Sequence, residues 1–231
     1  MQGLLLIDKP AGWTSFDVVN YVRKIVATAE GKKPKNVKVG HTGTLDPFAT
    51  GLLVLLVGKE YTKRAGELSK LDKTYEMTMK LGETSSTGDP EGEITPVSDT
   101  IPTQKALETA LKQFTGPIQQ VPPAFSAIKI DGERAYKLAR AGKEVKINPR
   151  QVTINRLDLV NYAYPAVKLV ADVSSGTYIR TLVEDLGKTL ATGAYTTELR
   201  RTKVGSYQIE DATGKDELTQ DLATRLQALP T

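Results

Sequence analysis

The sequence predicts an α+β (mixed α/β) fold for the chain, and the order of its elements is the main observation behind this. Short β-branched or alternating runs, typical of strands, occur at 3–8, 52–58, 74–82, 151–162 and 166–174. Longer apolar stripes at helical spacing occur at 15–27, 103–114 and 181–190. The predicted strands do not alternate strictly with the predicted helices, and the chain is not all β. We therefore expect a mixed sheet rather than a doubly wound one.

Each predicted helix presents one apolar stripe. The stripe of 15–27 includes Val18, Val22 and Val26, that of 103–114 includes Leu107 and Leu111, and that of 181–190 is formed by Leu182, Val183, Leu186 and Leu190. The segment 82–99 is polar and rich in turn residues, so we expect a connection there. A terminal helix is predicted over 216–229. The sequence contains no internal repeat, and we expect a single domain over 1–231.

Composition excludes several classes of protein. The chain has 231 residues, of which 39% are hydrophobic, enough for a substantial core. It has no cysteine and one histidine, so it forms no disulfide and leaves only carboxylates to bind a metal. The longest apolar run, 52–57, is far shorter than the roughly twenty residues that span a bilayer. We expect a cytoplasmic enzyme that uses no metal and no cofactor.

The net charge of +4 is concentrated in one segment. Between 120 and 150 the acidic residues are Asp131, Glu133 and Glu144, and outside this segment basic and acidic residues are equal in number. One interpretation is an element that faces nucleic-acid phosphates, and the alternative is a solvated surface. The basic residues of this segment are Lys129, Arg134, Lys137, Arg140, Lys143, Lys146 and Arg150.

The segment 40–51, GHTGTLDPFATG, contains the only histidine, His41, and an aspartate in a glycine-punctuated turn. Glycines allow the backbone to approach a ligand closely, and the proline after Asp46 restricts that residue to extended or turn conformations. Asp-Pro also commonly caps a helix or opens a turn, which is the structural alternative. The pattern therefore predicts a rigid loop that holds one carboxylate.

This loop resembles the signature loop of the TruB family of pseudouridine synthases. Five other segments also resemble motifs of this family, and all six occur in the order found in the family. They lie at 3–10, 73–75, 121–127, 175–180 and 199–201 and extend along nearly the whole chain. The resemblance implies a pseudouridine synthase fold: a bent mixed sheet flanked by helices, a central active-site cleft and an inserted thumb at about 120–150. It also implies the conversion of uridine 55 in the TΨC loop of tRNA to pseudouridine, with an aspartate attacking a flipped-out uridine.

By this resemblance Asp46 is the catalytic aspartate, and Arg180 is the arginine that pairs with it. Alternation along a strand would place Tyr178 and Arg180 on the same face. Arginine is mostly exposed in proteins, so a surface arginine is the alternative. Leu199 would line the pocket that receives the uracil.

The resemblance also gives Tyr75 the role of stacking on the target uracil, with its phenol as a candidate for the proton step. A half-buried strand tyrosine is the alternative. His41 would contact the RNA near the flipped nucleotide, and the alternative is a loop histidine with a structural hydrogen bond. Lys9, Pro10 and Gly12 resemble the family's N-terminal motif, which would shape and back the active-site loop. In the thumb, Lys129, Lys143 and Lys146 are the candidates for contacts with the RNA backbone.

Several alternatives to a stand-alone tRNA enzyme remain open. One is a guide-RNA-dependent relative, whose members rely on a PUA domain and protein partners. Another is a non-catalytic tRNA chaperone, which the combined presence of Asp46, Tyr75, Tyr178 and Arg180 argues against. A nucleotide hydrolase is disfavoured because no Gly-Lys-Ser/Thr follows the glycine-rich loop. We expect a monomer that binds the T-stem-loop, with no obligate protein partner, no membrane association and no PUA domain.

Overall fold

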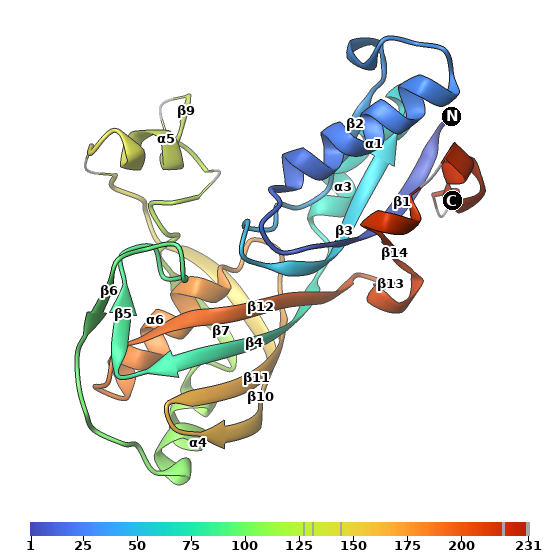
Figure 1. Ribbon diagram of the computed structural model, residues 1–231. Coiled ribbons are helices and arrows are strands. Elements are labelled where there is room, and N and C mark those ends of the chain that lie inside the picture. Colours follow the sequence, from blue (N-terminus) through green and yellow to red (C-terminus); the bar gives the residue numbers. More distant parts are fainter. Residues whose placement is uncertain (127, 131, 144, 219, 230–231) are drawn as a thin grey trace. The chain divides into compact units, whose positions relative to one another are not determined.

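The computed structural model describes residues 1–126, 128–130, 132–143, 145–218 and 220–229 (Figure 1). The chain divides into two compact units. The first comprises Met1–Tyr75 and Arg200–Thr231, and the second comprises Glu76–Leu199. Two long strands, β4 (Lys73–Leu81) and β12 (Ala194–Val204), contribute residues to both.

The first unit is built on the antiparallel pair β1 (Gly3–Lys9) and β3 (Thr50–Val57). Around this pair, β14 (Thr213–Gly214) runs parallel to β1, the end of β12 runs parallel to the start of β3, β2 (Val39–His41) is antiparallel to β3, and β13 (Tyr207–Gln208) is antiparallel to β12. The shorter helical segments are η1 (Pro34–Asn36), α2 (Lys59–Lys63), α3 (Ala65–Ser69) and η2 (Ile209–Asp211).

Side-chain alternation along β1 and β3 divides the core of this unit into two layers. On one face Leu5 and Leu53 pack with the apolar stripe of α1 (Ser15–Ala29), and on the other Leu4 and Leu52 pack with Leu68 of α3. The sheet is therefore buried on both faces, and this explains why β3 reads as a continuous apolar run rather than an alternating one.

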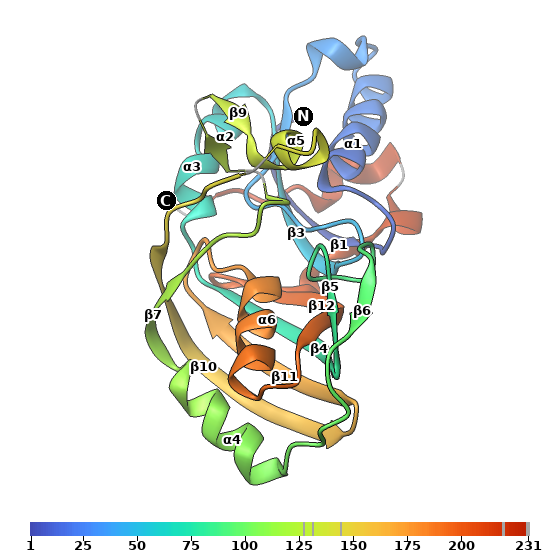
Figure 2. The same cartoon turned by 90° about the vertical axis from the view of Figure 1, so that its left-hand side faces the viewer.

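The second unit has the strand order β12-β4-β11-β10-β7. Strand β11 (Ala166–Val173) and strand β7 (Gly116–Gln120) are both antiparallel to β10 (Arg150–Ala163). Helices α4 (Gln104–Gln113) and α6 (Ile179–Thr189) lie on the same face of this sheet (Figures 1 and 2). Apart from the terminal helix expected over 216–229, the predicted strands and helices of both units are thus confirmed, with boundaries that differ by a few residues.

The segment predicted to be the thumb lies between β7 and β10. Its ends are direct neighbours in the sheet, because Gln120 of β7 pairs with Arg150 of β10. Within the segment, β8 (Lys129–Ile130) and β9 (Glu133–Arg134) form a small antiparallel ladder, followed by α5 (Ala135–Arg140). The thumb segment is therefore an insertion between two paired strands.

One predicted regular element was wrong. The terminal helix expected over 216–229 is replaced by the 3-10 turns η3 (Lys215–Glu217) and η4 (Gln220–Arg225). The reason is tertiary: Leu218 and Leu222 are drawn into the core around α1, and Gln227 exchanges two backbone hydrogen bonds with Leu4. The polar connection 82–99 also contains an unexpected hairpin, β5 (Glu83–Ser85) and β6 (Ile94–Pro96).

No helix in the described part of the chain combines the length and hydrophobicity needed to cross a membrane.

Candidate active site

Asp46 lies in the loop that joins β2 to β3 in the first unit. Its carboxylate side chain is partly exposed, whereas the neighbouring Leu45 and Ala49 are buried. The N–H of Ala49 donates to the Asp46 carbonyl at 3.2 Å, which closes a turn around Pro47. The loop thus buries its apolar side chains and leaves its single carboxylate accessible.

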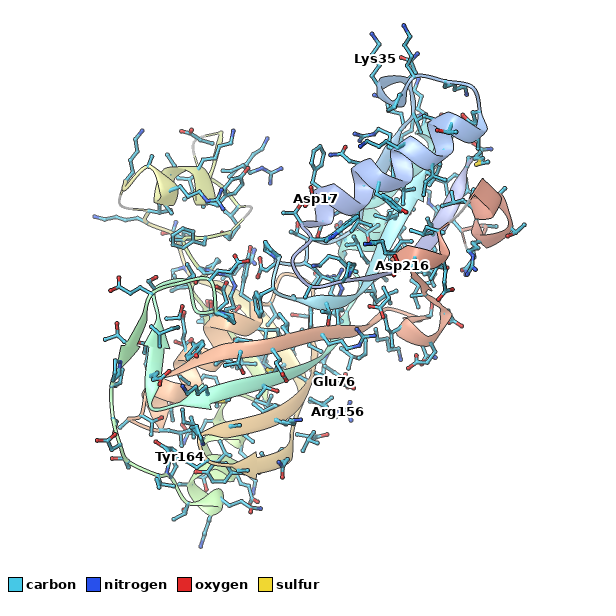
Figure 3. All side chains as sticks on the ribbon, in the orientation of Figure 1. Asp17, Lys35, Glu76, Arg156, Tyr164 and Asp216 are labelled. Carbon is cyan, nitrogen blue, oxygen red and sulfur yellow. The ribbon has the colours of Figure 1, made fainter. Side chains whose placement is uncertain are left out.

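Ser15, the first residue of α1, anchors the loop on one side of Asp46. Its hydroxyl accepts from the Leu45 N–H at 2.8 Å and donates to the Leu45 carbonyl at 3.0 Å. Ser15 is itself fixed by the capping box at the start of α1, in which Thr14 and Asp17 bond each other's backbone. Figure 3 labels Asp17 at this end of the helix. A helix terminus is therefore joined rigidly to the residue that precedes Asp46.

Lys9, at the end of β1, supports the other side of the loop. Its side chain is fully buried, and its ammonium group donates to the carbonyls of Pro10, Trp13 and Pro47 at 2.9, 2.6 and 3.3 Å. The Gly12 N–H adds a second hydrogen bond to the Pro47 carbonyl at 2.9 Å. The predicted backing of the loop by the N-terminal motif is confirmed, and its mechanism is a buried lysine that bonds three carbonyls.

Arg201 of β12 connects the Asp46 loop to the sheet through hydrogen bonds. Its side chain, 2% exposed, donates from Nε to the Leu52 carbonyl at 2.8 Å and from Nη2 to the Gly43 carbonyl at 3.1 Å. A longer contact, 3.4 Å, joins Nη1 to the Thr44 carbonyl. The backbone of β12 passes so close that a Cβ on Gly51 would lie 2.3 Å from the Arg201 carbonyl oxygen, so only glycine fits there.

These anchors hold the main chain on both sides of Asp46. The carbonyls of the three residues before it and of the residue after it each accept a hydrogen bond from Ser15, Lys9 or Arg201. Two of the three donors are buried cations, which form stronger hydrogen bonds than neutral groups do. The arrangement restricts the movement of the carboxylate, which is the condition for efficient nucleophilic or electrostatic catalysis.

Tyr75 of β4 is connected to the same support. The tyrosine is 8% exposed, and its hydroxyl lies 3.5 Å from Nη1 of Arg201. Two residues earlier, Lys73 is also buried and donates to the carbonyls of Ser69 and Leu71. Burial, and next the charge of Arg201, lowers the pKa of Lys73 from 10.5 to about 8. Arg201 therefore joins the aspartate loop to the predicted stacking tyrosine.

His41 is the last residue of β2, where it pairs with Leu55 of β3, and its side chain is partly buried. It immediately precedes the Asp46 loop, so it borders the site within the first unit. The RNA contact expected of His41 stays a prediction.

In the second unit, the predicted strand placement of Tyr178 and Arg180 was wrong. A turn at Gly176, whose φ is +83°, ends the extended chain, Tyr178 is the N-cap of α6, and Arg180 is the second residue of that helix. The turn forms because glycine readily adopts this backbone conformation. Tyr178 is held by Gln120, whose side-chain amide accepts from the Tyr178 N–H at 2.8 Å and donates to the Tyr178 carbonyl at 3.0 Å.

Arg180 is a buried arginine, 3% exposed, and not a surface one. Its guanidinium donates to the carbonyls of Thr87 and Phe125 at 2.8 and 2.9 Å and lies 3.3 Å from a carboxylate oxygen of Asp89. Asp89 in turn accepts from the Thr87 hydroxyl at 2.6 Å. The expected pairing of Arg180 with Asp46 joins residues of different units and stays a prediction.

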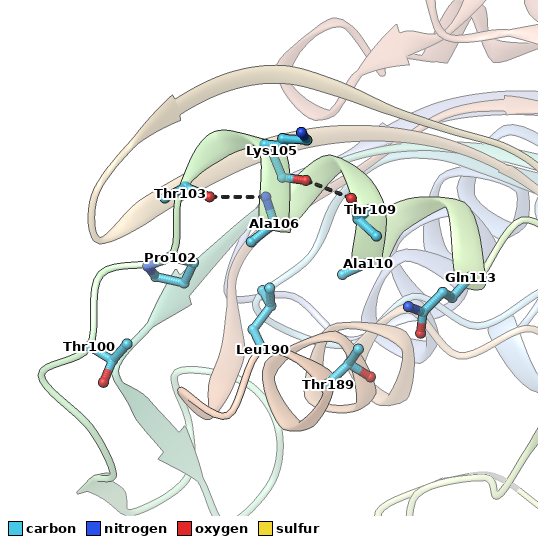
Figure 4. A pocket seen from close by; sticks show the side chains of 10 residues that line it. All are labelled: Thr100, Pro102, Thr103, Lys105, Ala106, Thr109, Ala110, Gln113, Thr189 and Leu190. Atoms are coloured by element: carbon cyan, nitrogen blue, oxygen red, sulfur yellow. Dashed lines mark hydrogen bonds between the residues drawn. The ribbon is translucent and has the colours of Figure 1, made fainter.

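The remaining predicted site residues are Leu199 and the three thumb lysines, and they differ in exposure. Leu199 is buried on β12, whereas the thumb lysines Lys129, Lys143 and Lys146 are all exposed. A pocket between α4 and the end of α6, lined by residues such as Thr103, Thr109 and Leu190, contains none of the predicted site residues (Figure 4). Within the described ranges, no group of three or more histidine, aspartate or glutamate side chains is placed to hold a metal ion.

Sequence reasoning missed the supporting residues Ser15, Asp89, Gln120 and Arg201. For Arg201 a signal existed: alternation along a strand through 199–201 places the second arginine on the same face as Leu199, and both are buried. Asp89 lay in a turn-rich segment where an aspartate is ordinary. Gln120 and Ser15 carried no signal, because their partners are 58 and 30 residues away in sequence.

Comparison with known proteins identifies the family. Residues 30–179 match the model of the TruB family pseudouridylate synthase N-terminal domain, and residues 180–228 match that of the tRNA pseudouridylate synthase B C-terminal domain. A protein named tRNA pseudouridine synthase B from Pseudomonas putida is 46% identical over 220 residues, which cover 95% of this chain and 69% of that protein. Its counterpart from Thermobifida fusca is 44% identical over 230 residues, which cover 95% of this chain and 75% of the relative.

Among solved structures, the chain is similar to one described as a Cbf5-Nop10-Gar1 complex. The match has a TM-score of 0.71 and 27% sequence identity, and it covers 95% of this chain and 54% of the other. A structure of an H/ACA RNP bound to a substrate RNA, at 22% identity and a TM-score of 0.69, covers 98% of this chain and 59% of the other and shows the same fold. Together with the anchored Asp46 loop, these matches establish that the chain belongs to the TruB family of pseudouridylate synthases.

Proposed function

We propose that this enzyme converts uridine 55 in the TΨC loop of tRNA to pseudouridine, with Asp46 as the nucleophile. The observation that carries the proposal is the anchoring of the Asp46 loop, because a carboxylate fixed by main-chain bonds on both sides is preorganised for attack. Relatives that are 44 to 46% identical are named tRNA pseudouridine synthase B, which supports tRNA as the substrate.

The reaction is an internal rearrangement. The N1–C1′ bond breaks, the uracil turns while it remains bound, and C5 bonds to C1′; C5 then loses its proton and N1 gains one, so the product is an isomer of the substrate. The enzyme therefore needs a nucleophile, a cage for the detached base and a route for one proton, and it needs no redox group. We assign the first role to Asp46, base stacking to Tyr75 and lining of the base pocket to Leu199.

Arg180 would supply the positive charge that keeps Asp46 ionised when a base covers it, because burial otherwise disfavours a charged carboxylate. Its burial and its Asp89 partner support this role, since a fixed guanidinium keeps its direction during the reaction. His41 and Tyr178 would contact the RNA around the flipped nucleotide. Stacking of one base on an aromatic ring contributes about 1–3 kcal/mol, which offsets much of the cost of flipping.

We further propose that the enzyme works in the cytoplasm as a monomer without an obligate protein partner. The guide-RNA-dependent alternative is less well supported, because identity to the relatives named tRNA pseudouridine synthase B is 44 to 46%, against 27% to the chain from the Cbf5-Nop10-Gar1 complex.

The test is to incubate the purified protein alone with an unmodified tRNA transcript and to map pseudouridine by carbodiimide labelling and primer extension. The expected result is modification of uridine 55 in the presence of a chelator, on full tRNA and on a T-stem-loop alike. A transcript with cytidine at position 55 is the control. Absence of pseudouridine, or its appearance only at other uridines, would overturn the assignment.

A further inference from the structure

The start of α6 lacks the local features that normally fix a helix terminus. Tyr178 is the N-cap, but no side-chain hydrogen bond caps the helix, and its first turn contains no acidic residue. The preceding turn depends on the flexible residue Gly176. The positions of Tyr178 and Arg180, both assigned above to the RNA site, must therefore be determined by more distant contacts.

Gln120 supplies the first of these contacts. Its side chain is 1% exposed and bonds both the N–H and the carbonyl of Tyr178, as a neighbouring strand would. A buried amide that uses its donor and its acceptor on one backbone residue fixes both the position and the direction of that residue. Gln120 is the last residue of β7 and the first residue of the thumb segment.

Arg150, the strand partner of Gln120 at the other end of the thumb segment, supplies the second contact. Its guanidinium carbon lies 5.0 Å from the centre of the Tyr178 ring, within the range of a cation–π interaction. One of its nitrogens donates to the Gly176 carbonyl. Arg150 therefore contacts the Tyr178 ring and the turn at Gly176, while Gln120 bonds the backbone of Tyr178.

A third contact extends this support to Arg180. Its Nη2 donates to the carbonyl of Phe125, five residues after Gln120, at 2.9 Å. The two ends of the thumb segment thus contact Tyr178, the N-cap of the helix that carries Arg180, and Phe125, near the first end, contacts Arg180 itself. From these contacts we infer that Gln120 and Arg150 are positioning residues, which hold Tyr178 and Arg180 in the geometry for catalysis. The inference rests on the proposed function of this site.

A positioning role and an RNA-binding role of the thumb segment predict different effects of substitutions. Loss of an RNA-backbone contact weakens binding, whereas loss of a positioning contact slows the chemical step on RNA that is already bound. Changes at the two ends of the thumb segment should therefore affect the single-turnover rate at saturating enzyme, and changes at its exposed lysines should affect affinity.

The experiment compares Gln120→Ala with Gln119→Ala, its exposed neighbour on the same strand. On a T-stem-loop transcript, we expect Gln120→Ala to lower the single-turnover rate at least about tenfold with RNA affinity within about threefold. Gln119→Ala should match the wild type. Gln120→Asn, which keeps the amide but is one methylene shorter, should behave like Gln120→Ala. A wild-type rate for Gln120→Ala would overturn the inference, whereas an inactive wild type would instead overturn the proposed function.

A double-mutant cycle distinguishes positioning from general structural damage. If Gln120 acts through Tyr178, then Gln120→Ala should add little to the rate loss of Tyr178→Ala, and additive losses would contradict the inference. Should Gln120→Ala fail to fold, Arg150→Met provides the same test at a half-buried position, with Arg156→Met on the same strand as its control. Equal rates for these two arginine variants would also count against it.

Discussion

Two groups of basic residues in this protein differ in burial and in what they bind. In the first unit Lys9, Lys73 and Arg201 are buried and donate to backbone carbonyls. In the thumb segment Lys129, Lys143 and Lys146 are exposed. Counting charges along the sequence directs attention to the second group, although Lys9 and Arg201 of the first group hold the loop that carries Asp46. The comparison teaches that the contribution of a cation to a site depends on whether it is buried and bonded there. We therefore expect substitutions of the buried cations to have larger effects than substitutions of the exposed ones.

The largest expected effect is at the carboxylate that the buried group supports. Asp46→Asn should abolish turnover and leave RNA affinity within a few fold, because it removes the nucleophile and keeps its shape. Both quantities are measured on one transcript, with Asp99→Asn, an exposed aspartate, as the control. Multiple turnover by a verified, uncontaminated Asp46→Asn protein would show that the buried cations support some other function.

The next effect concerns the two adjacent arginines of β12. Arg201→Met leaves the carbonyls of Gly43 and Leu52 without their buried donor, so we expect a loss of about 2–4 kcal/mol of unfolding free energy. The single-turnover rate should fall about 100-fold as the Asp46 loop loosens.

Arg200→Met is the matched control, because Arg200 makes a partly exposed ion pair with Asp8 at 2.7 Å. Such pairs contribute about 0–1 kcal/mol. Urea denaturation and single-turnover assays measure both variants. Equal losses of unfolding free energy and of single-turnover rate in the two variants would contradict the expectation that the buried arginine contributes more than the exposed one.

A third test uses the lowered pKa of Lys73. Because the folded protein binds this proton less tightly than the unfolded chain does, the ammonium form opposes folding below about pH 8, and this cost disappears as the pH rises from about 8 to 10.5. The unfolding free energy of the wild type should therefore increase relative to that of Lys73→Met by about 3 kcal/mol across the pKa interval of 8 to 10.5.

The measurement is urea denaturation of both proteins at several values of pH between 7 and 10.5. Lys70→Met, at an exposed lysine three residues earlier, should show the same pH dependence as the wild type. Parallel curves for the wild type and Lys73→Met would indicate that Lys73 keeps an ordinary pKa despite its burial.

The smallest effect on the chemical step is expected at the exposed lysines of the thumb. Replacing Lys129, Lys143 and Lys146 by glutamine should raise the dissociation constant and leave the single-turnover rate nearly unchanged. Each lost phosphate contact should lower the log–log salt slope by about 0.7 to 0.9. The control replaces three exposed lysines elsewhere in the same unit, Lys105, Lys112 and Lys168. An unaltered slope in the thumb variant would identify these lysines as an ordinary solvated surface.

Local patterns in the sequence were sufficient to predict most regular elements. The stripe of α1 and the alternation of β4, which buries Lys73 and Tyr75, depend only on the 3.6- and 2-residue periods of the backbone. The glycines and Asp-Pro step of 40–51 likewise predicted a tight loop around one carboxylate. Family motifs then predicted which enzyme family this loop belongs to.

The supports of the site were decided by the tertiary structure alone. Arg201 reaches carbonyls 149 to 158 residues away in sequence, and Gln120 reaches Tyr178 across 58 residues, so no local period encodes either contact. The same reason explains the error at 216–229, where a buried leucine core overrode local preference, whereas the error at 178–180 came from the turn at Gly176, which ends the extended chain before Tyr178. Sequence by itself determined the chemical groups and the elements that carry them, whereas folding determined which buried donors hold those groups in place.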